Sequence, residues 1–539
     1  MWARRQYDPR VRTDQPVGRR QSRRRRVAWI IVVLSVAVAI AVAGAPAAVA
    51  PAGSVAVIVV PTFAPAAYAD RGAVGLFVPG AGSTVSRERA LASLVRGRVV
   101  SSLVDLDGEP RLALSTRPAE TTIYVALPPP GPHHNVIRYP IAIVGPGYSG
   151  LLTSRSTRIK GLVSLADVAP TAAAIAAGRR ASIRARPGTA AAATLVRLDA
   201  QLAKAHDART GATLVLVGWL VAFSAGALLA GSALAGRAAV LTAPVALLSA
   251  LLLRAGGIAD PGVVIGLLAV LTGVGSLLLA ARPRVLVPAV VCSLLVVLVV
   301  LTGWPEVNAL AAIGPHPDGG GRFYGVTNEV ETLLLFPSLA AGAIVGAGGA
   351  AAIGLLLLVV VGWSRSGADG GGVVVVTAAF AVLLTRLTGV RLTPVRVVAG
   401  VAAVLAVGLA LVGLDTLLGG ASHVTEAVGG GPGALLDDVG RRLRISWSGA
   451  TAAAHTAFLC VLSIVGLAWL AFRGRDRPTV VAMVAAIVVS LVVNDTPVDV
   501  LGYGTLGCLA LTAWEESRVN SVRSGASSRL RALRSRPVR

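Results

Sequence analysis

The sequence predicts a polytopic α-helical membrane protein of about 12 spans, with an α/β domain inserted between the first span and the second. Three observations support this fold class. The 539-residue chain is 55% hydrophobic and 14% charged, with a mean hydropathy of +0.74, which is more apolar sequence than a water-soluble core can bury. The apolar residues recur in blocks of about 16 to 24, the length that crosses a bilayer. A long polar region, residues 51–210, separates the first block from the others.

The pattern divides the chain into five segments. They are a basic tail at 1–26, an anchor helix at 27–50, the α/β domain at 51–210, a membrane domain of about eleven spans at 211–514, and a second basic tail at 515–539. The Ala-rich end of the anchor resembles a signal-peptidase site. However, the apolar run is longer than a typical signal-peptide core and Pro51 disfavours cleavage after residue 50, so we expect the helix to be uncleaved.

The later spans are expected where apolar runs of sufficient length occur. These runs are 212–232, 237–254, 261–281, 284–303, 331–348, 350–363, 372–388, 395–414, 450–472, 478–493 and 498–514. The short loops around Arg237, Arg282, Arg391 and Arg475 then fall on the same side as both tails. Because short cytoplasmic loops carry an excess of Arg and Lys, we predict a plasma-membrane protein with both termini in the cytoplasm and the α/β domain outside.

The formal charge of +24 is concentrated at the two ends of the chain. Residues 1–26 contain ten Arg and two Asp, and residues 515–539 contain seven Arg and two Glu, so the tails carry net charges of +8 and +5. Basic clusters beside membrane spans are what the positive-inside rule and anionic lipids select. We therefore expect a lipid bilayer as the partner of these tails and no nucleic-acid binding.

Cysteine and nucleotide-binding patterns predict neither a metal nor a cofactor. Cys292, Cys460 and Cys508 all lie in apolar runs, which favours buried free thiols over a disulfide or metal framework. No GxxxxGK[ST] motif occurs, so direct use of ATP is not expected. Lys is almost absent beside Arg, which is typical of proteins from GC-rich bacterial genomes.

Strand and helix patterns alternate in residues 51–210. Continuous apolar runs at 55–60, 121–127 and 141–145 predict buried parallel strands, and helical periodicity occurs at 86–97, 166–178 and 189–206. The pattern predicts a compact α/β domain with a Rossmann-like layered sheet. Asp167 is expected to cap the helix that is entered through Pro170.

Three segments of this domain resemble the alkaline phosphatase and sulfatase superfamily, over about residues 55–180. GLVSLADVAPTAAAIAAG, 161–178, is similar to the family's strand and Asp-Val-Ala-Pro-Thr helix start, and IAIVGPGYSGLLTSRSTRIKG, 141–161, to its late strand and following loop. VAVIVVPTF and STVSRERALASLVRGR, 83–98, resemble the first strand and the nucleophile-bearing helix. The resemblance implies that Thr84 or Ser86 occupies the nucleophile position.

The metal ligands of that superfamily are missing from this sequence. The family places an Asp directly after the first strand, where Pro61 and Thr62 stand here, and an Asp-His turn where TTIYVALPPPG continues. His133 and His134 have no acidic partner at ligand spacing. Because a hydroxyl without the two metal ions is nearly inert, we interpret the domain as a catalytically degenerate phosphatase-like domain, retained for binding or scaffolding.

The stretch GGGRFYGVTNEVE, residues 319–331, places an unusual density of polar side chains beside a span. Further polar clusters occur at 364–372, 415–449 and 494–499, all on the predicted outer side. Arg322 can grip a phosphate with two N–H groups, and it needs a counter-charge from Asp369 or Asp495 at this depth. Solvated loops are the alternative interpretation. The candidate substrate-binding residues are Arg322, Tyr324, Asn328, Glu329, Asp369, Asn494 and Asp495.

Three functions remain open from the sequence alone. The first is an integral membrane protein of the bacterial cell envelope that handles a lipid-linked or phosphate-bearing envelope glycan at the outer face, with catalysis undecided. The second is a transporter or flippase, which the scarcity of polar residues near mid-span disfavours. The third is a non-catalytic scaffold that binds envelope-assembly proteins of the cell-wall machinery.

Overall fold

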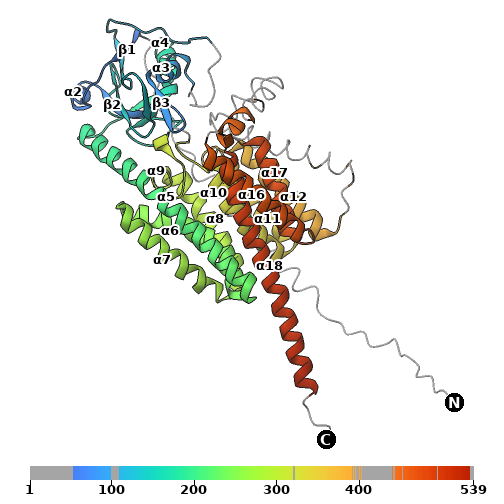
Figure 1. Ribbon diagram of the computed structural model, residues 1–539. Coiled ribbons are helices and arrows are strands. Elements are labelled where there is room, and N and C mark those ends of the chain that lie inside the picture. Colours follow the sequence, from blue (N-terminus) through green and yellow to red (C-terminus); the bar gives the residue numbers. More distant parts are fainter. Residues whose placement is uncertain are drawn as a thin grey trace, which may run out of the picture.

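The computed structural model describes residues 53–98, 109–319, 322–390, 443–451, 453–494 and 496–534, with residues 393, 395, 400, 402 and 440. An α/β domain lies at one end of a bundle of long apolar helices, and the last helix leaves the bundle at the opposite end (Figure 1). We call the end beside the α/β domain the domain end. The predicted basic tail and anchor at 1–50, and most of the predicted span at 395–414, lie outside the described residues.

The α/β domain is built on a mixed sheet of order β1-β4-β6-β2-β7-β9, with β8 beside β2. Its strands are β1 (Val55–Val60), β2 (Ala73–Val78), β4 (Thr121–Ala126), β6 (Tyr139–Val144), β7 (Gly150–Ser154), β8 (Leu162–Ser164) and β9 (Ile183–Arg186). The three predicted strands coincide with β1, β4 and β6. β1 and β4 are parallel as predicted, but β6 is antiparallel to β4 and β2. The connection from β4 to β6 contains the short strand β5 (Pro132–His134) in place of the crossover helix that a parallel pair requires.

Helices cover both faces of this sheet. One face packs with α3 (Arg87–Arg96) and α4 (Val168–Ala176), and the buried core there includes Leu94 and Ile175. Ser86 caps α3, because its hydroxyl accepts a hydrogen bond from the Arg89 amide. The prediction that the Asp167 side chain caps α4 was wrong. Asp167 occupies the N-cap position, but its carboxylate accepts a hydrogen bond from Ser156 and makes no cap bond.

The other face of the sheet packs on α5 (Ala191–Ala230), a continuous helix of 40 residues. The sequence predicted a helix at 189–206 followed by a separate span, with the domain boundary at 210. The structure shows no break, because residues 207–211 contain no proline and Gly211 packs closely against Ile265. At 1.5 Å per residue the helix is about 60 Å long, roughly twice the hydrocarbon thickness of a bilayer.

Long apolar helices form the bundle. They are α6 (Ala233–Ala255), α7 (Pro261–Ala280), α8 (Leu286–Gly303), α10 (Asn328–Val345), α11 (Ala347–Gly362), α12 (Gly370–Thr388), α16 (Ala454–Arg473), α17 (Pro478–Val493) and α18 (Pro497–Arg534). Among the described residues, seven helices are long and apolar enough to cross a membrane, namely α5, α6, α7, α8, α10, α12 and α16. α11 and α17 are apolar but have 16 residues each. The chain is thus a multi-pass membrane protein, and the predicted number of 12 spans stays a prediction.

Close helix packing in the bundle depends on glycine at the crossing of α6 and α18. A Cβ atom added at Gly236 would lie 2.3 Å from Ser517 Oγ and 3.1 Å from Trp514 Cα. We expect Gly236→Leu to destabilise the protein by about 1 to 3 kcal/mol, the usual cost of overpacking, and to lower the melting temperature in detergent. Gly266→Leu in α7, where a Cβ would meet nothing within 4 Å, is the matched control and should leave it unchanged. Equal melting temperatures for the two variants would contradict this packing.

Candidate functional site

A buried ion pair lies at the domain end of the bundle. Arg322 precedes α10, Asp369 stands at the N-cap of α12, and Arg322 Nη1 lies 3.4 Å from Asp369 Oδ2. The Arg322 side chain is 33% exposed, whereas that of Asp369 is 7% exposed. The sequence predicted this counter-charge for Arg322, and the structure confirms the contact between the two side chains.

Glu331 adds a second carboxylate to this pair. It lies in the first turn of α10 with 2% of its surface exposed, close enough to Arg322, Asp369 and Asn494 to interact with them. Asn494, at the C-cap of α17, donates a hydrogen bond to Ser490 Oγ at 2.7 Å. We call Arg322, Glu331, Asp369 and Asn494 the polar cluster. It contains two acidic groups and one basic group.

Four atoms of the polar cluster are buried without a hydrogen-bond partner among the described residues. They are Arg322 Nη1, both carboxylate oxygens of Glu331 and Asp369 Oδ2. The Arg322 and Asp369 atoms form an ion pair without the geometry of a hydrogen bond, and Asn494 approaches Glu331 without reaching that geometry. A buried unpaired polar atom costs about 1 to 3 kcal/mol. Such a concentration in a folded protein is unusual enough to need a functional explanation.

The other predicted site residues lie around this cluster and point elsewhere. Asn328 donates a hydrogen bond to Thr496 Oγ1 at 2.6 Å. Glu329 lies beside Tyr503, and its Oε2 is 3.9 Å from His316 Nε2. The Tyr324 ring faces the α/β domain. Asp495 lies outside the described residues, so its predicted place in the pocket is untested.

Arg158 of the α/β domain holds the two loops that carry Arg322 and Asp369. Its backbone is in the left-handed region, with φ of 57°, in the turn between β7 and β8. The guanidinium carbon lies 3.8 Å from the centre of the Tyr324 ring, and the two Nη atoms donate to the carbonyls of Arg365 at 2.9 Å and Ser364 at 2.5 Å. This one side chain therefore ties the α/β domain to both sides of the polar cluster.

The two loops are also bonded to each other. The Val326 amide donates to the Gly367 carbonyl at 3.1 Å, and Asn308 Nδ2 donates to the Gly325 carbonyl at 2.9 Å. Gly325 has a φ of 86°, and a Cβ atom there would lie 2.1 Å from the Gly367 oxygen. Position 325 therefore requires glycine.

A second buried ion pair joins α5 to the loop before Arg322. Arg209 in α5 donates to Asp318, and His206 Nδ1 lies 2.6 Å from the other carboxylate oxygen of Asp318. Burial alone would raise the pKa of the Asp318 carboxyl, but Arg209 and the hydrogen bond from His206 hold that pKa below its usual value. Asn135 of the α/β domain donates to the neighbouring Gly319 carbonyl at 2.9 Å.

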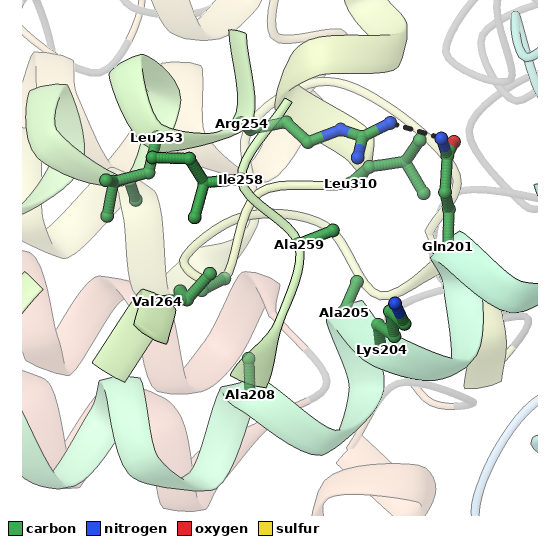
Figure 2. A pocket seen from close by; sticks show the side chains of 12 residues that line it. Gln201, Lys204, Ala205, Ala208, Leu253, Arg254, Ile258, Ala259, Val264 and Leu310 are labelled. Atoms are coloured by element: carbon green, nitrogen blue, oxygen red, sulfur yellow. Dashed lines mark hydrogen bonds between the residues drawn. The ribbon is translucent and has the colours of Figure 1, made fainter. Parts of the chain in front are cut away.

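A small cleft lies beside these residues, between α5 and the connection from α6 to α7 (Figure 2). Arg254 points across it and donates a hydrogen bond to Gln201 at 2.9 Å, and Lys204 lies on the same side of α5. The cleft has room for little more than a water-sized molecule. None of the seven predicted site residues lines it, so it is not the candidate site.

The residues that the phosphatase resemblance singled out lie in or beside a short two-stranded ladder. Thr84 pairs with His134, and Val85 with His133, in the two-stranded ladder of β3 (Thr84–Ser86) with β5. His133 Nε2 lies 3.0 Å from the Pro129 carbonyl. The described residues contain no group of three or more His, Cys, Asp or Glu side chains that could hold a metal ion.

Comparison with known proteins identifies no relative. No protein-family model, no curated protein and no solved structure matches this chain. The resemblance to the alkaline phosphatase and sulfatase superfamily therefore stays a prediction.

Sequence reasoning missed several residues of this site, and two of them carried a recognisable signal. Glu331 is a carboxylate inside a membrane-length apolar run, which is costly unless it has a function. Arg209 is a basic residue at one end of a span. The positive-inside rule assigns that end to the outer face, where it does not favour a basic residue. Arg158 and Asn135 carried no such signal, because their contacts depend on how the α/β domain sits on the bundle.

The pair of Arg209 and Asp318 gives a testable stability prediction. Asp318→Ala leaves Arg209 buried and unpaired, and we expect a loss of about 3 to 5 kcal/mol in unfolding free energy, measured by denaturant unfolding in detergent. His206→Ala, which removes a 46% exposed partner, is the control and should cost much less. Because the folded-state pKa of Asp318 is lowered, its contribution is present at neutral pH and lost as pH falls through that pKa. A wild-type stability equal to that of Asp318→Ala at pH 7 would contradict the assignment.

Proposed function

We propose that this protein binds a phosphate-bearing, lipid-linked glycan of the bacterial cell envelope at the outer face of the plasma membrane. The polar cluster is the binding site, and Arg322 contacts the phosphate. The observation that carries this proposal is the set of four buried atoms in the cluster that have no hydrogen-bond partner among the described residues. One of them is a donor and three are acceptors, so a ligand that satisfies them must offer both kinds of group.

A phosphate-bearing glycan offers both kinds of group. Phosphate oxygens accept hydrogen bonds from the Arg322 guanidinium, whose planar fork can engage two of them. Sugar hydroxyls can donate hydrogen bonds to the carboxylate oxygens of Glu331 and Asp369. An inorganic anion without a donor, such as sulfate, would leave those acceptors without partners and would meet two acidic groups beside one basic group. The cluster therefore favours a glycan phosphate over a free anion.

The position of the polar cluster supports a ligand that is anchored in the membrane. The cluster lies at the ends of α10, α12 and α17, beside the loops that Arg158 bonds to the α/β domain. A lipid-linked head group reaches this level while its chain remains among the apolar helix surfaces. In this proposal the α/β domain covers the head group, and Arg158 fixes its position through the loops of Arg322 and Asp369.

Transport of the same ligand is the second candidate function, and Glu331 is the observation that favours it. An acidic side chain buried inside an apolar helix is typical of proteins that move ions or solutes across membranes. Glu331 lies only three residues from the start of α10, however, and α10 contains Pro337 further along. Movement of labelled lipid across proteoliposomes, abolished by Glu331→Gln, would establish this second function in place of binding alone.

Substitution of Arg322 tests the proposed phosphate contact. We expect Arg322→Lys to reduce affinity for a polyprenyl diphosphate-linked saccharide at least tenfold, which corresponds to about 1.4 kcal/mol, because Lys keeps the charge but loses the planar fork. The measurement is native mass spectrometry of the purified full chain titrated with that probe. Asp369→Asn should also weaken binding, because it removes the contact that orients Arg322.

Arg282→Lys is the matched control, since Arg282 is exposed between α7 and α8 and far in sequence from the polar cluster. It should bind the probe as the wild type does. Melting temperatures of all three variants identify any that fail to fold. Unchanged affinity in a folded Arg322→Lys variant would disprove the phosphate contact.

Cysteine labelling tests the proposed orientation. In a chain whose three native cysteines are replaced by Ala, we expect Thr116→Cys to react with an impermeant thiol reagent in intact cells and Arg282→Cys to react only after the cells are opened. Both positions are exposed, and they lie in the α/β domain and in the turn after α7. The reverse pattern of labelling would place the α/β domain and the polar cluster inside the cell.

A further inference from the structure

Four arginines gather at one edge of the sheet, away from the polar cluster. Arg184 and Arg186 lie on β9, the last strand in the sheet order, while Arg155 follows β7 and Arg180 precedes β9. We call Arg155, Arg180, Arg184 and Arg186 the arginine edge. Their charges are close enough that Arg184 interacts with all of the other three.

Strand register explains why these side chains share one face. β7 and β9 are antiparallel, with Leu151 opposite Arg186 and Thr153 opposite Arg184. Because alternate residues of a strand point to the same face, Arg184 and Arg186 lie on one side, and Arg155 continues that side beyond the end of β7. Nothing in the hydrophobic core requires this arrangement, since Arg186 and Arg155 are exposed and Arg184 is half-buried.

The arginine edge has no counter-charge in the described part of the chain. None of the four residues forms an ion pair with a described acidic residue, and the one hydrogen bond from their side chains runs from Arg184 Nε to the Ala181 carbonyl at 3.3 Å. Burial raises the pKa of the neighbouring Tyr148 to about 12, so this phenol is neutral at pH 7. Among the described residues, the four positive charges therefore interact only with one another.

Burial and repulsion both act on the Arg184 guanidinium. Burial, and then the charges of Arg155, Arg180 and Arg186, lower the pKa of the Arg184 guanidinium to about 10. It remains protonated at pH 7, so the folded domain keeps a half-buried guanidinium among like charges. A ligand with several negative charges would relieve that repulsion, and guanidinium groups bind phosphate oxygens in pairs.

The position of β9 favours a ligand outside the bilayer. The hydrogen bond between Gln201 and Arg254 marks the level at which α6 ends, and Ala191 at the start of α5 follows β9 closely. From Gln201 back to Ala191 the helix rises about 15 Å at 1.5 Å per residue. The start of α5, and β9 just before it, therefore lie beyond the end of α6 along the axis of α5.

We propose that Arg155, Arg180, Arg184 and Arg186 form a binding site for an extended polyanion that carries closely spaced phosphate groups. The site is separate from the polar cluster and does not depend on the function proposed for it. Binding at this edge would hold a phosphate-rich polymer beside the α/β domain, near the start of α5 and beyond the end of α6.

Inorganic polyphosphate is the probe for this site. The full chain is placed in nanodiscs of zwitterionic lipid, and binding of fluorescent polyphosphate is followed by anisotropy as a function of salt. We expect Arg184→Gln with Arg186→Gln to weaken binding at least tenfold. The negative slope of log affinity against log salt should become shallower by roughly 0.7 for each phosphate group that the variant no longer binds. Arg184→Lys with Arg186→Lys should bind between the wild type and the Gln variant.

The matched control removes the same charge from the opposite edge of the sheet. Arg111 and Arg117 are exposed in the segment whose residue Ser115 is bonded to β1, the first strand in the sheet order. Arg111→Gln with Arg117→Gln should leave polyphosphate binding unchanged. Equal losses in the two double variants would overturn the proposal, because the binding would then follow net charge alone.

Two further outcomes would also overturn it. The first is polyphosphate binding that persists in the Gln variant, with a melting temperature that shows the variant is folded. Arg186→Gln alone, at an exposed position, repeats this test with the least risk to folding. The second is loss of wild-type polyphosphate binding when anionic lipid is added to the nanodisc, since the arginine edge would then serve the membrane surface.

Discussion

The continuous helix α5 is the constraint on which the rest of the arrangement depends. Its first turns carry Leu195, Leu198 and Leu202, which pack against the sheet, and its second half lies in the bundle. A helix bends sharply only where a proline or a local break interrupts it, and α5 contains neither between Ala191 and Ala230. The sheet is therefore held at a fixed position over the bundle. Side chains of the α/β domain can then bond to the loops at that end of the bundle.

Several charged side chains are buried because of this contact between the α/β domain and the bundle. Arg158 and Asn135 bond to loops of the bundle, and these loops close over Arg322, Asp369 and Asp318. Removing water from such side chains strengthens the interactions that are formed and raises the cost of those that are not. Both carboxylate oxygens of Asp318 have hydrogen-bond partners, and only Nε of Arg209 lacks one, whereas four atoms of the polar cluster have none among the described residues. The same covering thus stabilises one set of charges and leaves the other with unmet hydrogen-bonding capacity.

Hydrophobic patterns predict much of this architecture, because they report local burial. The strands β1, β4 and β6 and most of the bundle helices lie close to their predicted ranges, although an apolar run does not reveal the direction of β6. The pairing of Arg322 with Asp369 was also predictable, because a cation beside lipid needs a counter-charge. The unpredicted features depend on contacts between segments that are distant in sequence. The polar stretch before Gly211 suggests a loop, yet packing on Ile265 keeps it helical within α5. The lack of a hydrogen-bond partner for Glu331 can be recognised only when the position of every neighbouring side chain is known.

The two arginine sites differ in the chemistry that they can recognise. Arg322 has carboxylates beneath it, so an anion that binds there must also donate hydrogen bonds or lose affinity to repulsion. The arginine edge has no described carboxylate beside it, so affinity there depends on how many phosphates the ligand presents. Selection by hydrogen-bonding pattern suits a single defined head group, whereas selection by charge density suits a repetitive polymer. Taken together, the two proposals predict that the protein holds a polymer of phosphate groups close to a membrane-anchored glycan.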